Sequence, residues 1–152
     1  MNAKTILFPT DFSRLSDNAL HRATVLAKES NAKLLILHVE EPPSAYAGGE
    51  MYYGMPEPDH EALKEMLARI TPHDPDLAFE RRLEIGDPAS EIVRVAEEED
   101  VDMIVMATHG RTGLTRLLMG SVAESVVRHA PCAVLSLKEP HRAKDAQEES
   151  VR

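Results

Sequence analysis

Several residue types that other protein classes depend on are scarce in this sequence. Cys132 is its one cysteine, so no disulfide can form within the chain, and a reducing compartment is expected. No cysteine and histidine cluster has the spacing of a zinc site. No apolar run is long enough to span a membrane or to form the core of a signal peptide, which predicts a cytoplasmic protein with no membrane association.

Basic and aromatic residues are also few. The chain has 17 Lys and Arg against 26 Asp and Glu, a formal net charge of −9, so it has no basic stripe that could displace counterions from a nucleic acid. Aromatic residues make up 4% of the sequence, too few to form a platform on which unpaired bases stack. We therefore expect no nucleic-acid binding. A chain of 152 residues suits one domain, which would bury about 70% of its unfolded surface.

Short apolar runs alternate with amphipathic segments along the chain, a pattern typical of βαβ units. Continuous apolar runs such as 34–37 suit a parallel sheet that is covered on both faces. Short right-handed crossovers then leave few arrangements other than an α/β domain. The charged residues of the third predicted strand, 78–85, favour a position at the edge of the sheet. The predicted strands are 4–9, 33–39, 78–85, 103–106 and 132–137.

Four helices are predicted between these strands, with apolar residues at helical spacing. The first begins after Ser13, the second covers 61–70, and the fourth ends before Pro131. The third begins at Asp87 and Pro88, which fits an aspartate cap followed by proline in the first turn. The apolar stripes expected in the first three helices are Leu15, Ala19, Ala23, Leu26 and Ala27; Leu63, Met66, Leu67 and Ile70; and Ala89, Ile92, Val93 and Ala96.

The segment 40–58 is rich in proline and glycine and also contains Tyr46, Tyr52 and Tyr53. Loops of this length in compact domains are usually functional or disordered. One interpretation is a flap that places a tyrosine against a base; the other, which we favour, is a mobile surface connection. The polar segment 139–152 predicts a disordered tail, so the domain is expected to cover 1–138.

The most informative stretch is 101–127, VDMIVMATHGRTGLTRLLMGSVAESVV. A buried strand leads into a glycine-rich loop, and a helix follows whose start at Ser121 and Glu124 fits a capping box. Such a loop holds phosphate in many folds, because unpaired backbone N–H groups and the positive helix end point at the anion. The loop glycines are Gly110, Gly113 and Gly120.

The charges of this stretch favour the same interpretation. Residues 103–123 include His109, Arg111 and Arg116 but no Asp or Glu, although the whole chain contains 26 acids. Because this glycine-rich loop has no acidic side chains in an otherwise acidic protein, it would not repel a bound anion.

The segment Ala107-x2-Gly110-x9-Gly120-Ser121 resembles the nucleotide-binding signature of the universal stress protein family, Gly-x2-Gly-x9-Gly-Ser/Thr, with alanine in place of the first glycine. FPTDFS at 8–13, HV at 38–39 and GDPASEI at 86–92 support the resemblance, which covers 4–138. It implies a Rossmann-like, adenine nucleotide alpha hydrolase-like α/β fold: a five-stranded parallel sheet of order 3-2-1-4-5 with four helices on its two faces.

The resemblance also implies an ATP site between the first and fourth strands, where ligands bind in such sheets. It would place Pro9, Thr10 and Asp11 near the adenosine, the backbone of Val39 against the adenine, and Met106 and Ala107 beside the base and ribose. Gly110, Arg111, Gly120, Ser121 and Val122 would surround the phosphates, with His109 and Gly113 in the same loop. Mg²⁺ or Mn²⁺ would arrive with the phosphates, and no protein metal ligands are expected.

Most of these residues also have structural interpretations. Asp11 could cap the first helix and Ser121 the fourth, and the loop glycines could serve turns with positive φ. Arg111 could be a solvated charge, and His109 could bond within its loop. For the remaining candidates we favour structural roles: His38, His60, His73, His129 and Cys132.

The sequence lacks the residues of a dedicated phosphotransferase. It has no Gly-x4-Gly-Lys-Ser/Thr segment, no kinase-like Asp and Asn pair and no identifiable base, so slow hydrolysis at most is expected. The leading hypothesis is an ATP-binding regulator of the stress response with an unknown protein partner. The alternatives are a dimeric interaction module whose site is degraded at Ala107, and a weak ATPase or phosphotransferase. The apolar strand 132–137, an unprotected edge, predicts a homodimer, as does the resemblance.

Overall fold

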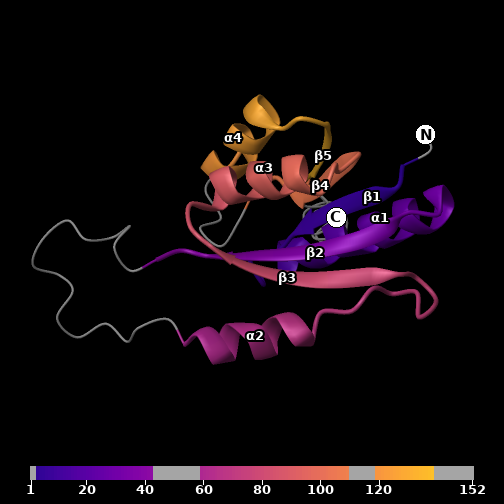
Figure 1. Ribbon diagram of the computed structural model, residues 1–152, viewed down its shortest axis with the longest axis horizontal. Coiled ribbons are helices and arrows are strands. Elements are labelled where there is room, and N and C mark those ends of the chain that lie inside the picture. The colour runs from indigo at the N-terminus through magenta and orange to yellow at the C-terminus, as the bar shows by residue number, and fades with distance from the viewer. Residues whose placement is uncertain (1–2, 43–58, 110–118, 139–152) are drawn as a thin grey trace, which may run out of the picture.

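A five-stranded parallel sheet forms the centre of the molecule (Figure 1). The computed structural model describes residues 3–42, 59–109 and 119–138. Within them the elements follow the order β1 (Thr5–Pro9), α1 (Arg14–Ser30), β2 (Lys33–Glu40), α2 (His60–Ala68), β3 (Phe79–Ile85), α3 (Pro88–Glu98), β4 (Met103–Ala107), α4 (Ser121–His129) and β5 (Ala133–Leu137). None of these helices has the length and apolar character needed to span a lipid bilayer.

The strand order is β3-β2-β1-β4-β5, and all neighbouring pairs are parallel, which confirms the predicted fold. The central strand β1 pairs through Leu7 with Leu35 of β2 and with Ile104 of β4. Strands β3 and β5 lie at the edges, as the charge of β3 predicted. Each predicted strand end lies within one residue of the observed one.

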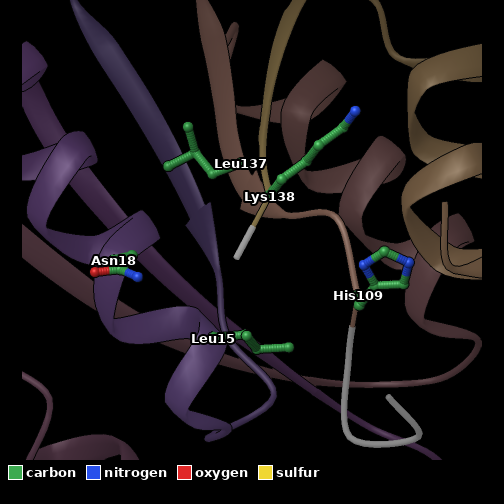
Figure 2. A pocket seen from close by; sticks show the side chains of 5 residues that line it. All are labelled: Leu15, Asn18, His109, Leu137 and Lys138. Atoms are coloured by element: carbon green, nitrogen blue, oxygen red, sulfur yellow. The ribbon is translucent and has the colours of Figure 1, made fainter. Parts of the chain in front are cut away.

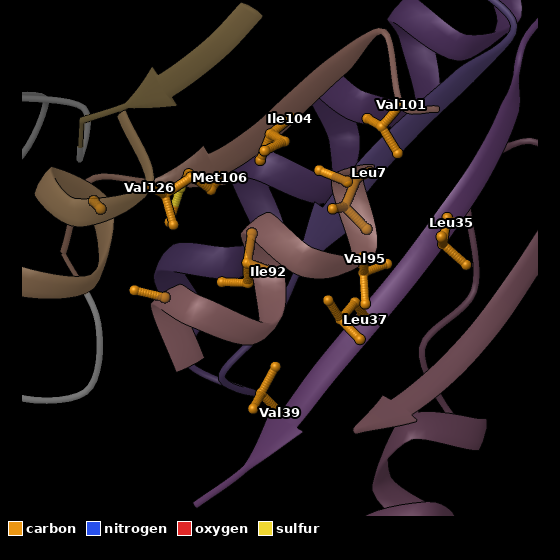
Figure 3. Packing of buried hydrophobic residues seen from close by; sticks show 13 residues of the cluster. Leu7, Leu35, Leu37, Val39, Ile92, Val95, Val101, Ile104, Met106 and Val126 are labelled. Atoms are coloured by element: carbon orange, nitrogen blue, oxygen red, sulfur yellow. The ribbon is translucent and has the colours of Figure 1, made fainter. Parts of the chain in front are cut away.

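Alternate residues of the central strands face two apolar clusters on opposite sides of the sheet. On one face α3 and α4 cover Leu7, Leu35, Leu37 and Ile104 (Figure 3). On the other face α1 and α2 cover Ile6, Phe8, Leu34 and Ile36. Burial on both faces explains why these strands are continuous apolar runs.

The buried stripes of the helices are rotated from the predicted ones. In α3 the buried residues are Ala89, Ile92, Val95 and Ala96, so the prediction of Val93 in place of Val95 was wrong. Each helical residue turns the chain by about 100°, which places the middle of this stripe between Ile92 and Ala96 and leaves Val93 at its margin. The stripe of α1 is displaced in the same way: Leu20 is buried, whereas Leu15 and Leu26 are only partly buried. Met66 of α2 is 37% exposed.

The helix starts show which capping predictions were correct. Asp87 is the N-cap of α3, with Pro88 in the first turn, and its carboxylate accepts from the Ser90 amide at 3.0 Å. Hydrogen bonds from the Ser90 hydroxyl and amide hold the pKa of the Asp87 carboxyl below its ordinary value. The capping box at Ser121 was wrong: Gly120 is the N-cap of α4, and its carbonyl accepts from the Glu124 amide at 2.9 Å.

Charged side chains fasten the sheet at two places. At the start of β1, the Asp102 carboxylate accepts from the amides of Lys4 and Thr5 at 2.7 and 2.9 Å, and these bonds lower the pKa of Asp102. On edge strand β3, Arg82 pairs with Glu84 on its own strand and, at the end of α3, with Glu98 and Glu99. Charge on an edge strand discourages pairing with another chain.

The rotation of α3 predicts unequal effects for two neighbouring valines. Val95 is fully buried and Val93 only partly, so Val95→Ala should lower the free energy of unfolding by about 2 kcal/mol. Val93→Ala should change it by less than about 0.5 kcal/mol. Urea denaturation followed by circular dichroism measures both. Equal losses, or a larger loss at Val93, would mean that α3 presents the other side to the sheet.

Candidate functional site

A cavity of about 570 Å³ opens where β1, β2 and β4 end and α3 and α4 begin. Its volume lies within the range of small-molecule sites, and it occupies the crevice where the winding of the sheet reverses. All the predicted site residues that the structure describes border this cavity: Pro9, Thr10, Asp11, Val39, Met106, Ala107, His109, Gly120, Ser121 and Val122. Gly110, Arg111 and Gly113 lie outside the described residues.

Further residues border the cavity that were not predicted. Glu40, Glu41 and Thr108 lie within two residues of the ends of predicted strands, so their position alone could have identified them. His38 had been given a structural role. Leu37 comes from β2 itself. The others come from helices, where only the tertiary packing shows which side faces the cavity: Ser16, Leu63, Pro88, Ile92 and Ala123.

Buried polar residues concentrate around the cavity. Among the described residues, those with a polar or charged side chain that is buried are Thr10, Ser16, Thr24, His38, Glu40 and Thr108. All except Thr24 border the cavity. Thr24 is explained locally, because its hydroxyl donates to the Leu20 carbonyl one helical turn earlier at 2.8 Å. Since a buried polar group is costly without a partner, this concentration indicates a binding site.

The turn after β1 holds Asp11 at the cavity. The amide of Thr10 donates to the Leu37 carbonyl at 2.8 Å, which prolongs the pairing of β1 with β2. Asp11 Oδ1 accepts from the Ser13 amide and from the Ser16 hydroxyl, both at 2.9 Å. Asp11 therefore organises the start of α1 and borders the cavity at once. Ser13 is the N-cap as predicted, but its own side chain makes no capping bond.

The segment from β4 to α4 brings a helix end to the cavity. The Thr108 amide donates to the Leu137 carbonyl at 2.8 Å, and the Gly120 amide donates to the Thr108 carbonyl at 2.9 Å. No side chain caps α4 among the described residues, and Ser121, Val122 and Ala123 of its first turn border the cavity. The first amides of a helix lack intrahelical acceptors and carry partial positive charge, so this end of the cavity suits an anion.

The other end of the cavity is acidic. Glu40 and Glu41 lie where β2 ends, and the Glu40 carboxylate lies 2.7 Å from His60 Nδ1, which comes from the start of α2. Within the described ranges, no group of three or more His, Cys, Asp or Glu side chains could hold a metal ion. The cavity thus has a carboxylate end at β2 and a helix-amide end at α4.

Thr108 has an unsatisfied hydroxyl. The residue is 4% exposed, and its Oγ1 is a buried side-chain polar atom with no hydrogen-bond partner in the part of the chain that the structure describes. A rotation about χ1 exchanges this hydroxyl with the methyl group of threonine, so a polar ligand could recruit it without backbone movement. An orphaned hydroxyl beside an uncapped helix end fits a ligand that brings acceptors, as a phosphate does.

A second, much smaller cavity lies between α1 and the ends of β4 and β5 (Figure 2). Its lining residues are Leu15 and Asn18 of α1, Leu137 and Lys138 at the end of β5, and His109 after β4. Its volume of about 10 Å³ is that of a single water, so it cannot hold an organic ligand.

Comparisons with known proteins agree on one family. The model of the "Universal stress protein family" matches residues 2–138. A universal stress protein of Methanocaldococcus jannaschii is 37% identical over 150 residues, which cover 91% of this chain and 84% of that protein. A solved structure of the hypothetical protein MJ0577 covers 93% of this chain and 99% of its own, with 28% identity and a TM-score of 0.70. A universal stress protein solved in complex with cAMP has 28% identity and a TM-score of 0.60, and covers 89% of this chain and 96% of its own.

The unsatisfied hydroxyl of Thr108 makes a prediction about stability. In the ligand-free protein, Thr108→Val replaces a hydroxyl that has no partner among the described residues by a methyl of the same shape, so the free energy of unfolding should rise by about 1 kcal/mol. Thr24→Val is the matched control, because its hydroxyl is equally buried but bonded, and it should leave stability unchanged or lower it. Urea denaturation measures both, and a loss of stability in Thr108→Val would show that the hydroxyl has a partner.

Proposed function

Because this chain belongs to the universal stress protein family, we propose that its cavity binds an adenine nucleotide, with ATP as the first candidate. Occupancy of the cavity by the nucleotide would regulate the binding of a protein partner in the stress response. The observation that carries the proposal is the start of α4, which no described side chain caps, at a cavity in the crevice of the sheet. The universal stress protein in complex with cAMP, which shares 28% of its residues with this chain, supports an adenine nucleotide as the ligand class.

The helix-amide end is where the phosphates would bind. The amides of Ser121 and Val122 and the hydroxyls of Ser121 and Thr108 supply donors for phosphate oxygens at this end. We assign Gly110, Arg111 and Gly113 to the same end, along with His109, on the resemblance alone. Mg²⁺ or Mn²⁺ would be held by the phosphates.

The strand ends would hold the adenosine. Val39 and Met106 are 9% and 6% exposed and offer apolar contact to a base, with Ala107 beside them. The carboxylates of Glu40 and Glu41 accept hydrogen bonds and repel phosphates, which favours an orientation with the base at β2 and the phosphates at α4. Asp11, between the two ends, would accept from the ribose.

The described cavity favours binding over turnover. A general base must have an acceptor within reach of the attacking water. Asp11 Oδ1 is held by two donors, and Glu40 is paired with His60. Glu41 and His109 have partners as well. We therefore propose slow ATP hydrolysis at most. The phosphotransferase alternative would be supported by an Asp11→Ala variant that binds but does not turn over, and rejected by undetectable turnover in the wild type.

The nonbinding alternative rests on Ala107, which replaces the first glycine of the signature. Ala107 borders the cavity, and its methyl group could crowd a ribose. Ala107→Gly would then restore binding to a protein that otherwise shows none, which separates a degraded site from a functional one.

The α4 amide that we assign to phosphate can be removed without changing the helix. Ser121 is the first helical residue, where proline is well tolerated, and the extended Gly120 backbone, with ψ of 152°, is compatible with a following proline. Ser121→Pro removes the amide donor and the hydroxyl, so ATP affinity should fall by tenfold or more, as expected for a roughly 1.5–3 kcal/mol hydrogen bond to a charged group. Ser121→Ala keeps the amide, so its ATP affinity should fall less than that of Ser121→Pro.

Calorimetric titration of the refolded, nucleotide-free protein with ATP and Mg²⁺ measures this difference. The wild type should bind with micromolar or better affinity. Equal ATP affinities for Ser121→Pro and Ser121→Ala would show that the Ser121 amide does not bind the nucleotide. If the wild type does not bind, the nonbinding alternative holds.

Strand β5 supports a proposed homodimer. It is an edge of the sheet, and its Val134, Leu135 and Leu137 are only partly buried in the single chain. Sedimentation should give twice the mass of one chain at micromolar concentration, and Ser136→Lys, which adds charge to the edge, should shift the equilibrium toward the monomer. A wild-type monomer at that concentration would contradict the dimer.

A further inference from the structure

His38 is a buried polar residue within an apolar strand. It is 8% exposed and lies on β2 between Leu37 and Val39, both buried. Its ring Nδ1 lies 2.7 Å from the Thr10 carbonyl oxygen. Because a carbonyl only accepts, Nδ1 carries the proton, and this bond sets the tautomer of the neutral ring. An apolar residue would fill the strand equally well, so packing in β2 does not explain the imidazole.

The same ring also contacts Phe12. The centroids of the two rings lie 4.2 Å apart, with planes tilted by 37°. Phe12 has a φ of 65°, in the left-handed region that bulky residues rarely adopt, and its amide donates to Thr10 Oγ1 at 3.1 Å. A strained backbone persists only where its surroundings hold it, and the stacked imidazole is part of what holds Phe12.

Asp11 lies between these two contacts. His38 holds the carbonyl of the preceding residue and the ring of the following one, while the Asp11 carboxylate is oriented by Ser13 and Ser16. We infer that His38 is a positioning residue: by fixing the backbone on both sides of Asp11, it holds that carboxylate at the cavity for the ribose of the nucleotide. This inference rests on the proposed function and adds a residue that determines its geometry.

Two substitutions separate the contacts of His38. His38→Phe keeps a ring for Phe12 but loses the donor to Thr10. His38→Asn loses the ring but keeps an amide donor close to the position of Nδ1. His38→Phe should weaken ATP binding about tenfold, a coupling within the range measured for contacting residues, and His38→Asn should recover part of the loss. Urea denaturation of each variant shows that it remains folded.

A double-mutant cycle with Asp11→Asn tests positioning against a general structural role. If His38 acts through Asp11, the His38→Phe factor in the ATP dissociation constant should fall to less than about twofold in the Asp11→Asn background. The same tenfold factor in both backgrounds would overturn the inference, as would wild-type affinity in a folded His38→Phe.

A measurement on the protein without nucleotide tests the role of His38 independently of the proposed function. The ¹³C chemical shift and titration of the Asp11 carboxylate, measured by NMR in the free protein, should change in His38→Phe and return toward the wild type in His38→Asn. If the wild type binds no nucleotide, the proposed function fails, while this comparison still decides whether His38 positions Asp11. An Asp11 signal that is identical in all three proteins would reject it.

Discussion

The backbone pairing of β1 with both β2 and β4 is the constraint on which the rest of the structure depends. Because β1 is central and parallel to both neighbours, the winding reverses between β1 and β4, and the helices separate to opposite faces. The strand ends and the first turns of α3 and α4 then surround one crevice. Two backbone bonds, from Thr10 to Leu37 and from Thr108 to Leu137, extend the pairing to the rim of the cavity. The cavity is thus a consequence of strand order, lined by residues that are far apart in the sequence.

Polar burial divides the molecule into a scaffold and a site. The two clusters that clamp the sheet are apolar, and α3 and α4 are packed on one face as α1 and α2 are on the other. The buried hydroxyl, imidazole and carboxylate groups gather instead at the crevice. Most of them are hydrogen-bonded there: Ser16 to Asp11, His38 to the Thr10 carbonyl, and Glu40 to His60. Burying such groups stabilises the fold little, because the free-energy cost of their desolvation offsets their hydrogen bonds. Their concentration at the crevice is therefore better explained by ligand binding. The exception is the Thr108 hydroxyl, which has no partner in the described part of the chain and which a ligand could satisfy.

The cavity is also electrically asymmetric. Carboxylates stand where β2 ends, the amides of α4 stand opposite, and Asp11 lies between them, fixed through its own bonds and through the contacts of His38 on either side. A molecule with a donor-rich ring at one end and phosphate at the other matches this polarity. The related universal stress protein that was solved in complex with cAMP holds a molecule of this kind. In the described wall, the Glu40 carboxylate is already paired with His60, and Asp11 Oδ1 accepts from Ser13 and Ser16.

Sequence reasoning succeeded where the signal is local. Apolar runs located the strands to within a residue of each end, Asp87 and Pro88 marked the start of α3, and the glycine signature led to the family and the sheet order. These features depend on backbone preferences and on hydrogen bonds between near neighbours. What only the tertiary structure decided depends on distant partners. The burial of Val95 instead of Val93 is set by the sheet beneath α3, and the cap at Gly120 is set by the bond of its amide to Thr108. The place of His38 in the cavity is set by its contacts with Thr10 and Phe12, which lie in the turn after β1. Residue spacing within β2 gives no sign of these contacts.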